Sequence, residues 1–152
     1  MNAGHARGFT LVELVVVVAI VAILAEIAIP SFSSLTASQT VRTAASTLQF
    51  ALLRARSEGL KRNTNVTLAP AVAGQWTAGW KVINPADGTN LSSYAAVSGV
   101  TITGPASVIF QGSGRLSGTA GATFKVSSTS TTDIRCVSTG LTGMPAVTTS
   151  GC

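Results

Sequence analysis

RGFTLVELVVVV, from Arg7 to Val18, is the stretch that decides the fold, because it places a carboxylate at the entrance of an apolar segment. Residues 9–29 contain no proline or glycine, and a helix of that length reaches about 31 Å, close to the thickness of a bilayer's hydrocarbon core. Glu13 and Glu26 bracket the uninterrupted apolar run, residues 14–25. An acidic residue inside a membrane helix costs about 2.5–3.5 kcal/mol on insertion scales. If this segment is a membrane helix, some interaction must offset the cost of inserting Glu13.

Three interpretations of this N-terminus compete. A secretory signal peptide would use His5 and Arg7 as its basic region, but no Ala-x-Ala cleavage site follows the apolar run, and Glu13 interrupts its entrance. A plain membrane anchor leaves Glu13 unexplained. The third interpretation is cleavage before the apolar segment instead of after it.

The residues GFTLVE resemble the prepilin-peptidase site of type IV pilins and type II secretion pseudopilins. This resemblance implies that residues 1–8 are a leader ending at Gly8, and that prepilin peptidase cleaves after Gly8. It also implies that Phe9 becomes the new, methylated N-terminus. Glu13 then stands at the fifth mature position, where the family has its acidic residue, and Pro30 is the counterpart of the family's helix-kinking proline.

The resemblance also gives Glu13 a role. In the family this acid pairs with the terminal amine of a neighbouring subunit, and pairing makes a buried carboxylate tolerable. A contact between the Phe9 amine and Glu13 of the same chain, at i,i+4 spacing, is the alternative. For Glu26 two interpretations stay open. We favour placement at the lipid headgroup level, and the other is a second pairing site in a filament.

The composition changes after Pro30 to serine, threonine, glycine, alanine and valine. The helix is expected to resume after a kink or break at Pro30 and to end near residues 61–63, which gives one long N-terminal helix. Apolar residues spaced by three and four positions predict an amphipathic helix that packs on a sheet: Val41, Ala45, Leu48, Leu52, Ala55 and Gly59.

From Asn65 onward the pattern is β, with strands expected at residues 66–68, 76–83, 100–103, 108–110, 123–126 and 134–137. Residues 84–90 have turn chemistry, QGSGRLSG and GLTG are expected loops, and Trp76 and Trp80 are expected in the core. The predicted fold class is α+β. Its parts are a transmembrane and assembly helix (9–30), an amphipathic helix half (31–63) and a small antiparallel β-sheet domain (64–152). This is the pilin architecture in outline, and VIFQGSGRLSG with DIRCVSTG resembles the H-type pseudopilins and the FimT/FimU-type minor pilins.

The two cysteines, Cys136 and Cys152, are expected to form a disulfide that closes a C-terminal loop, the default for a secreted domain. A loop of that length contributes roughly 3 kcal/mol in the chain-entropy model.

Enzymatic chemistry is not expected, and no cofactor or metal is implied. The only histidine, His5, lies in the predicted leader, which leaves the mature chain without imidazole catalysis or ligation. The three carboxylates after Pro30, Glu58, Asp87 and Asp133, have no metal-ligand spacing.

Nucleic-acid binding is the alternative function, because the net charge is +5. Some FimT-type minor pilins are DNA receptors in natural transformation and carry a C-terminal Gly-Arg-x-Arg motif. The corresponding stretch here, GLTG, has no arginine. Arg115, Lys125 and Arg135 would have to cluster in space to offer DNA or anion contacts.

The sequence therefore predicts a structural subunit, a minor pilin or pseudopilin, in the bacterial inner membrane. The expected topology is single-pass with a periplasmic C-terminal domain, followed by incorporation into a type IV pilus or a type II secretion pseudopilus. The expected partners are prepilin peptidase and other pilin or pseudopilin subunits.

Overall fold

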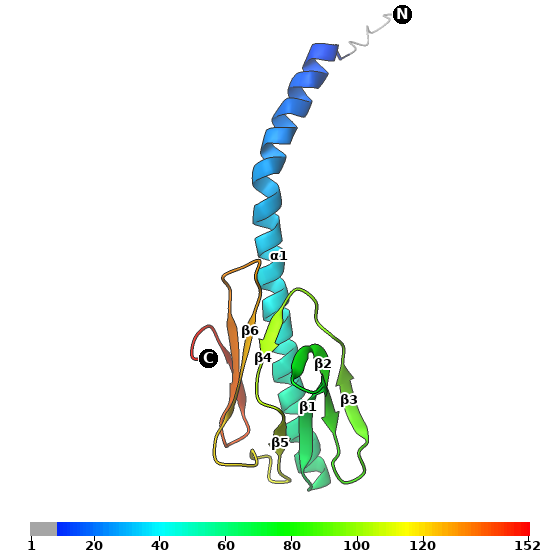
Figure 1. The fold of residues 1–152 in the computed structure, drawn as a ribbon, viewed down its shortest axis with the longest axis vertical. Coiled ribbons are helices and arrows are strands. Elements are labelled where there is room, and N and C mark those ends of the chain that lie inside the picture. Colours follow the sequence, from blue (N-terminus) through cyan, green and yellow to red (C-terminus); the bar gives the residue numbers. More distant parts are fainter. Residues whose placement is uncertain (1–8) are drawn as a thin grey trace, which may run out of the picture.

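The computed structural model describes residues 9–152, without the side chains of residues 27–30, and over this range contains one long helix followed by eight strands. The helix α1 (Leu11–Arg62) is 52 residues long. Its C-terminal half packs against the strands, whereas its N-terminal half extends beyond them as a bare stem (Figure 1). The leader residues 1–8, with His5, Arg7 and Gly8, lie outside the described residues.

The helix α1 continues through Pro30, which confirms the single long helix and excludes a break, one of the two alternatives at this residue. Figure 1 shows a gradual bend along the N-terminal half. Proline has no N–H group to donate to the carbonyl four residues earlier, which here belongs to Glu26, yet one missing bond does not end a helix whose neighbouring turns are intact. A kink centred on Pro30 stays a prediction.

The predicted end of the helix near residues 61–63 is confirmed. Asn63 adopts a left-handed conformation (φ 49°, ψ 41°), and its N–H points to the carbonyls of Gly59 and Leu60. Asparagine tolerates this conformation better than most residues, which makes it a suitable C-terminal stop.

The strands form two antiparallel sheets instead of the single sheet expected. The first has the order β3-β2-β1-β5, from β1 (Val66–Val72), β2 (Gln75–Ile83), β3 (Asn90–Tyr94) and β5 (Val108–Phe110). The second has the order β4-β6-β7-β8, from β4 (Thr101–Thr103), β6 (Ala122–Ser127), β7 (Arg135–Thr139) and β8 (Pro145–Thr148). Where β2 and β4 approach, Ile102 donates its N–H to the Thr77 hydroxyl (3.1 Å), and no strand ladder joins the two sheets.

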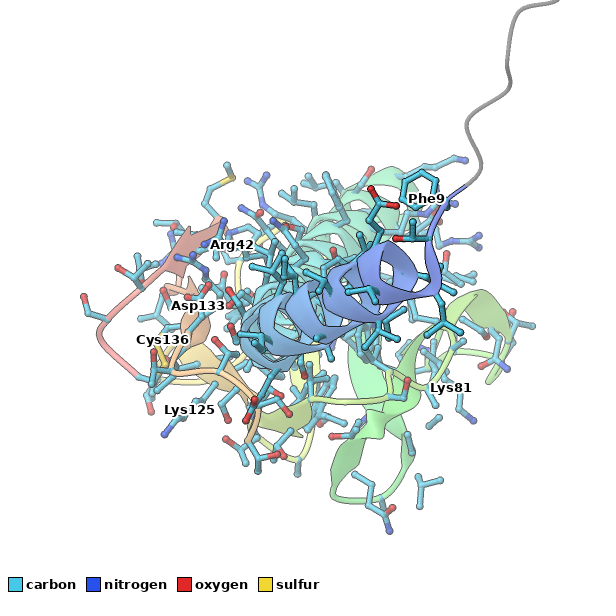
Figure 2. All side chains as sticks on the ribbon, turned by 90° about the horizontal axis from the view of Figure 1, so that it is seen from above. Phe9, Arg42, Lys81, Lys125, Asp133 and Cys136 are labelled. Carbon is cyan, nitrogen blue, oxygen red and sulfur yellow. A yellow bond between two sulfur atoms is a disulfide. The ribbon has the colours of Figure 1, made fainter. Side chains whose placement is uncertain are left out.

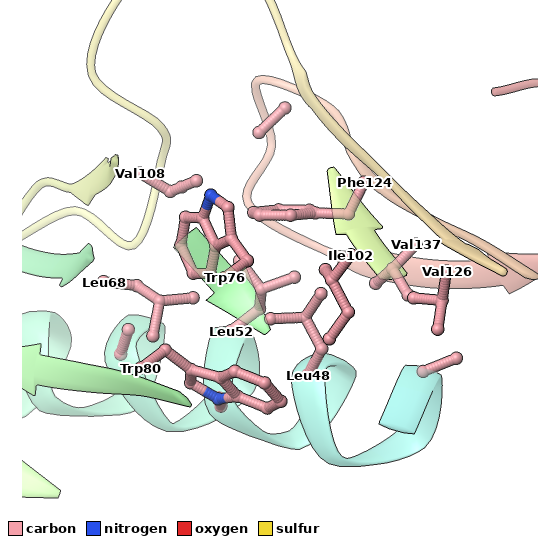
Figure 3. Packing of buried hydrophobic residues seen from close by; sticks show 14 of the residues in the cluster. Leu48, Leu52, Leu68, Trp76, Trp80, Ile102, Val108, Phe124, Val126 and Val137 are labelled. Atoms are coloured by element: carbon pink, nitrogen blue, oxygen red, sulfur yellow. The ribbon is translucent and has the colours of Figure 1, made fainter. Parts of the chain in front are cut away.

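The core lies between the two sheets and the C-terminal half of α1. All six residues of the predicted apolar stripe are buried. Trp76 and Trp80 are buried as predicted, and Trp76 packs edge-on against Phe124 of β6 with ring centroids 4.8 Å apart (Figure 3). The Trp76 indole N–H donates to the carbonyl of Pro105 (2.8 Å), which satisfies its buried polar group. One continuous core therefore fastens both sheets to the helix.

Six predicted strands are present, with ends shifted by a few residues, but β3 and β8 were not predicted. The sequence of β3, NLSSY, is polar because this strand is at a sheet edge and half-exposed. The other missed strand, β8, is a four-residue edge strand that begins with Pro145. Proline is tolerated at the start of an edge strand, where no ladder partner needs its N–H.

Candidate membrane-anchoring and assembly site

The first turn of α1 is built around Thr10 and Glu13. Thr10 is the N-cap residue, with an extended backbone, and its hydroxyl accepts a bond from the Glu13 N–H (3.3 Å). In return the Glu13 carboxylate accepts the Thr10 N–H and the Thr10 hydroxyl, both at 2.8 Å. This is a capping box, and it fixes the start of the helix two residues after Phe9.

The capping box also orients the Glu13 carboxylate. Both bonds from Thr10 end on Oε2, so Oε1 has no hydrogen bond to any described residue. The side chain of Phe9 is 80 % exposed at the same end of the helix. An incoming ammonium group can therefore approach Glu13 without disrupting the helix start. Thr10 was not predicted from the sequence, although its spacing to Glu13 is the Thr-x-x-Glu signature of a capping box.

The N-terminal half of α1 is long and apolar enough to cross a membrane, and its most apolar window has no buried residue. The large apolar side chains between Leu11 and Leu24 are all about half exposed or more. Such a surface is not stable in water, so it needs lipid or other helices around it.

The remaining carboxylate of this stem, Glu26, is also exposed. It lies about 20 Å along the helix from Glu13. Because Pro30 cannot donate to the Glu26 carbonyl, this turn presents both a carboxylate and a backbone acceptor. This geometry is compatible with headgroup placement and with a second pairing site, so both stay predictions.

Polar side-chain contacts hold α1 to the domain near the end of the stem. Arg42 donates from Nε to Asp133 (3.0 Å), and Arg135 contacts the same carboxylate (3.3 Å). One turn earlier, the hydroxyls of Ser38 and Thr131 are 2.7 Å apart. The loop between β6 and β7 is thereby tied to α1 near the point where the helix leaves the domain (Figure 2).

The three cations suggested for DNA or anion contacts do not cluster, which corrects that expectation. Arg135 is opposite Val126, a core-facing residue of β6, whereas Lys125 is opposite Cys136, so the two cations point from opposite faces of the sheet. Arg135 is also held by Asp133. Arg115 belongs to the β5–β6 loop, and Asp133 to the β6–β7 loop. These two loops are at opposite ends of the domain (Figure 1).

The predicted disulfide is present. Cys136 of β7 is joined to Cys152, with Cα atoms 5.4 Å apart. It ties the chain after β8 back to the outer face of the second sheet, next to Lys125 (Figure 2).

Comparisons with known proteins agree with this arrangement. Residues 44–143 match the family described as type II transport protein GspH, and residues 4–25 match the prokaryotic N-terminal methylation motif. A comparison with curated proteins found no match.

Among solved structures, two crystal forms of the type IV minor pilin FimU from Pseudomonas aeruginosa (strain PAO1) have a similar fold. The form in space group P65 is 20 % identical, with a TM-score of 0.63 over 70 % of this chain and 91 % of that chain. The form in space group P21 is 18 % identical, with a TM-score of 0.60 over 73 % and 88 %. None of these matches supports the DNA-binding alternative.

Proposed function

The chain belongs to the family of the type II transport protein GspH, and from that premise we propose that it is processed, anchored and assembled as a minor pilin or pseudopilin. The members and structural neighbours are pilin-like structural subunits and not enzymes. One observation carries the proposal: the methylation motif leads directly into a helical stem that no part of the described domain covers. A segment of this kind is built to be covered by something other than its own domain.

Processing comes first in this proposal. Prepilin peptidase cleaves between Gly8 and Phe9 and methylates the new amine. Glu13 then pairs with the Phe9 amine of a neighbouring subunit. The unoccupied Oε1 supports this role, because the Thr10 cap holds the carboxylate at the helix end without using all of its acceptor capacity.

The proposed location is the bacterial inner membrane, with the β-sheet domain in the periplasm until the subunit enters a type IV pilus or a type II secretion pseudopilus. The stem spans the bilayer, and the Cys136–Cys152 disulfide fits an oxidising compartment. Two large apolar side chains of α1 beyond the stem, Phe32 and Phe50, are 71 % and 64 % exposed, which supports helix packing inside a filament.

Intact mass measurement of the full-length chain, purified from its native host, tests the proposal. We expect loss of residues 1–8, gain of one methyl group, and loss of two hydrogens for the cystine. A protein that still begins at Met1, or that has lost its whole apolar stem, would contradict it.

A further inference from the structure

Three segments meet at the end of the domain remote from the N-terminus: the last turns of α1, the β5–β6 loop and the turn between β7 and β8 (Figure 1). Arg56 donates from Nε to the carbonyl of Gly114 (3.0 Å), and the Leu116 N–H donates to the carbonyl of Leu141 (3.1 Å). A Cβ on Gly114 would lie 3.0 Å from the Leu60 side chain, so the loop packs directly on the helix. We call the exposed face of this junction the distal surface, formed by Arg56, Leu60, Arg115, Leu141 and Met144.

The distal surface combines apolar side chains with unpaired positive charge. Leu60, Leu141 and Met144 are 46 %, 36 % and 55 % exposed. Among the described residues no carboxylate lies within 4.0 Å of Arg56 or Arg115. Apolar side chains beside arginines are typical of protein interfaces. The positive charge of the arginines favours an acidic partner.

Membrane lipid is not a suitable partner for this surface. About 32 residues of α1 separate Pro30 from the distal end, a distance of about 48 Å along the helix. A domain anchored through its stem therefore holds the distal surface away from the bilayer. Nucleic acid is also a poor fit, because this face has two guanidinium groups, no aromatic side chain for base stacking and three large apolar groups.

The globular part of a second copy of this chain lacks the acidic face that the surface requires; the exposed Glu13 and Glu26 lie in the stem, which lipid or other helices must cover. Of the three side-chain carboxylates of the globular part, Glu58 is held by Arg54 and Arg62, and Asp133 by Arg42 and Arg135. The third, Asp87, accepts the N–H and hydroxyl of Thr89 within a turn that contains no large apolar side chain.

We propose that the distal surface binds an acidic, partly apolar face of a different pilin-like subunit, an inference that rests on the proposed function. The apolar side chains supply the buried area, and Arg56 and Arg115 select the partner by charge. This chain then occupies its assembly beside a non-identical neighbour at its membrane-distal end.

Site-specific photo-cross-linking of the full-length chain in its native host tests this inference. A photoreactive phenylalanine derivative replaces Met144 in one variant and Val18 of the stem in another. We expect the probe at Met144 to join the chain to a different pilin-like subunit, at a peptide of that subunit that contains aspartate or glutamate. Adducts at Val18 report assembly in general.

Charge reversal supplies the matched comparison. Arg115→Glu should lower the yield of the Met144 adduct about tenfold, equivalent to about 1.4 kcal/mol of binding free energy, whereas Lys125→Glu makes the same change on another face and should leave it unchanged. Converting the acidic residue of the partner to lysine should restore the adduct of Arg115→Glu, which excludes misfolding as the cause of its loss.

The outcomes separate the two proposals. Adducts at Val18 with none at Met144 would overturn the inference and leave the proposed function standing. Loss of adducts at both positions would overturn both. A Met144 adduct with a second copy of this chain or with nucleic acid, or equal effects of Arg115→Glu and Lys125→Glu, would overturn the inference alone.

Discussion

At the scale of single residues, Glu13 has one observed role, in the capping box, and one proposed role, in assembly. Its carboxylate completes the capping box with Thr10, and its charge is available to a partner amine. The cap was readable in principle from Thr-x-x-Glu, because it depends on spacing within one turn. In the proposed function the partner amine comes from another molecule after cleavage, so neither the spacing nor the isolated chain contains it.

Substitution of Glu13 tests these two roles. Glutamine also serves at this position of a capping box, so Glu13→Gln keeps the helix start and removes the charge. We expect both Glu13→Gln and Glu13→Ala to insert into the membrane and to be depleted from filaments about tenfold or more, as loss of a pairing of about 1.4 kcal/mol or more implies. Immunoblots of sheared filament and membrane fractions measure this. If Glu13→Gln assembles normally while Glu13→Ala does not, the cap and not the charge is what matters.

Gly143, in the β7–β8 turn, is a position where both the backbone conformation and the packing of the domain require glycine. It has φ 79°, and an added Cβ would collide with the carbonyl of Gly114. Gly74 has a similar φ of 74°, but a Cβ added there would meet nothing within 4 Å. Gly74→Ala should therefore cost about 1–2 kcal/mol from backbone conformation alone, whereas Gly143→Ala should cost more because the clash adds to it.

Denaturant unfolding of the full-length chain in detergent, followed by tryptophan fluorescence, compares these two glycine variants. Trp76 and Trp80 are both buried and report the core of the domain. Equal losses of unfolding free energy in Gly74→Ala and Gly143→Ala would show that the contact between the β7–β8 turn and Gly114 is unimportant.

At the scale of elements, prediction succeeded where a pattern is local and repeated. The apolar stripe from Val41 to Gly59 specified the buried face of α1, since every third or fourth residue must face the sheets. Prediction from the sequence failed for the strands β3 and β8, because edge strands are paired on one side only and need little apolar character. One long helix was predicted, with a kink or a break left open at Pro30. The helix continues there because intact turns on either side compensate for one lost hydrogen bond.

The distal end of α1 carries a pH-dependent element. Arg62 donates a hydrogen bond to Glu58 (2.9 Å), and this bond, together with the charge of Arg54, holds the Glu58 pKa below its usual value although burial opposes the shift. A lowered folded-state pKa stabilises the fold above the unfolded-state pKa of about 4.3. That contribution is lost as the pH falls through the folded-state value.

Glu58→Gln should remove this pH dependence. At neutral pH we expect it to lower the free energy of unfolding by about 1 kcal/mol, because two screened i,i+4 pairs are lost. Below the folded-state pKa the variant and the parent chain should converge. Unfolding curves at neutral pH and at acidic pH measure the difference, and a gap that persists at acidic pH would assign the effect to packing instead of charge.

At the scale of the whole molecule, the chain has an uncovered apolar stem and a packed domain, for which we propose different solvents. The division was predictable, because composition changes at Pro30 and the apolar segment is contiguous. The distal surface was not predictable from the sequence. Its three segments, α1, the β5–β6 loop and the β7–β8 turn, meet only through tertiary contacts such as that of Arg56 with Gly114. A positive net charge indicates that cations are in excess, but only the fold decides which of them share a face.

Removal of residues 1–35 tests whether the two parts are independent. The core of the domain begins at Val41, and the first side-chain bond from α1 to the domain is made by Ser38. We therefore expect a chain starting at Thr36 to be soluble without detergent, to retain the Cys136–Cys152 disulfide, and to unfold within about 4 °C of the full-length midpoint, equivalent to less than about 1 kcal/mol. It should be absent from membranes and filaments, because the stem and Glu13 are gone.

Leu48→Ala in the full-length chain makes the opposite change: it destabilises the domain and leaves the stem intact. Leu48 is fully buried in the core, and its truncation should cost about 2–5 kcal/mol of unfolding free energy. The stem is untouched, so the variant should still partition into the membrane fraction while its domain unfolds at a lower denaturant concentration. Aggregation of the chain starting at Thr36, or loss of Leu48→Ala from membranes, would show that stem and domain stabilise one another and that the exposed stem is not an independent anchor.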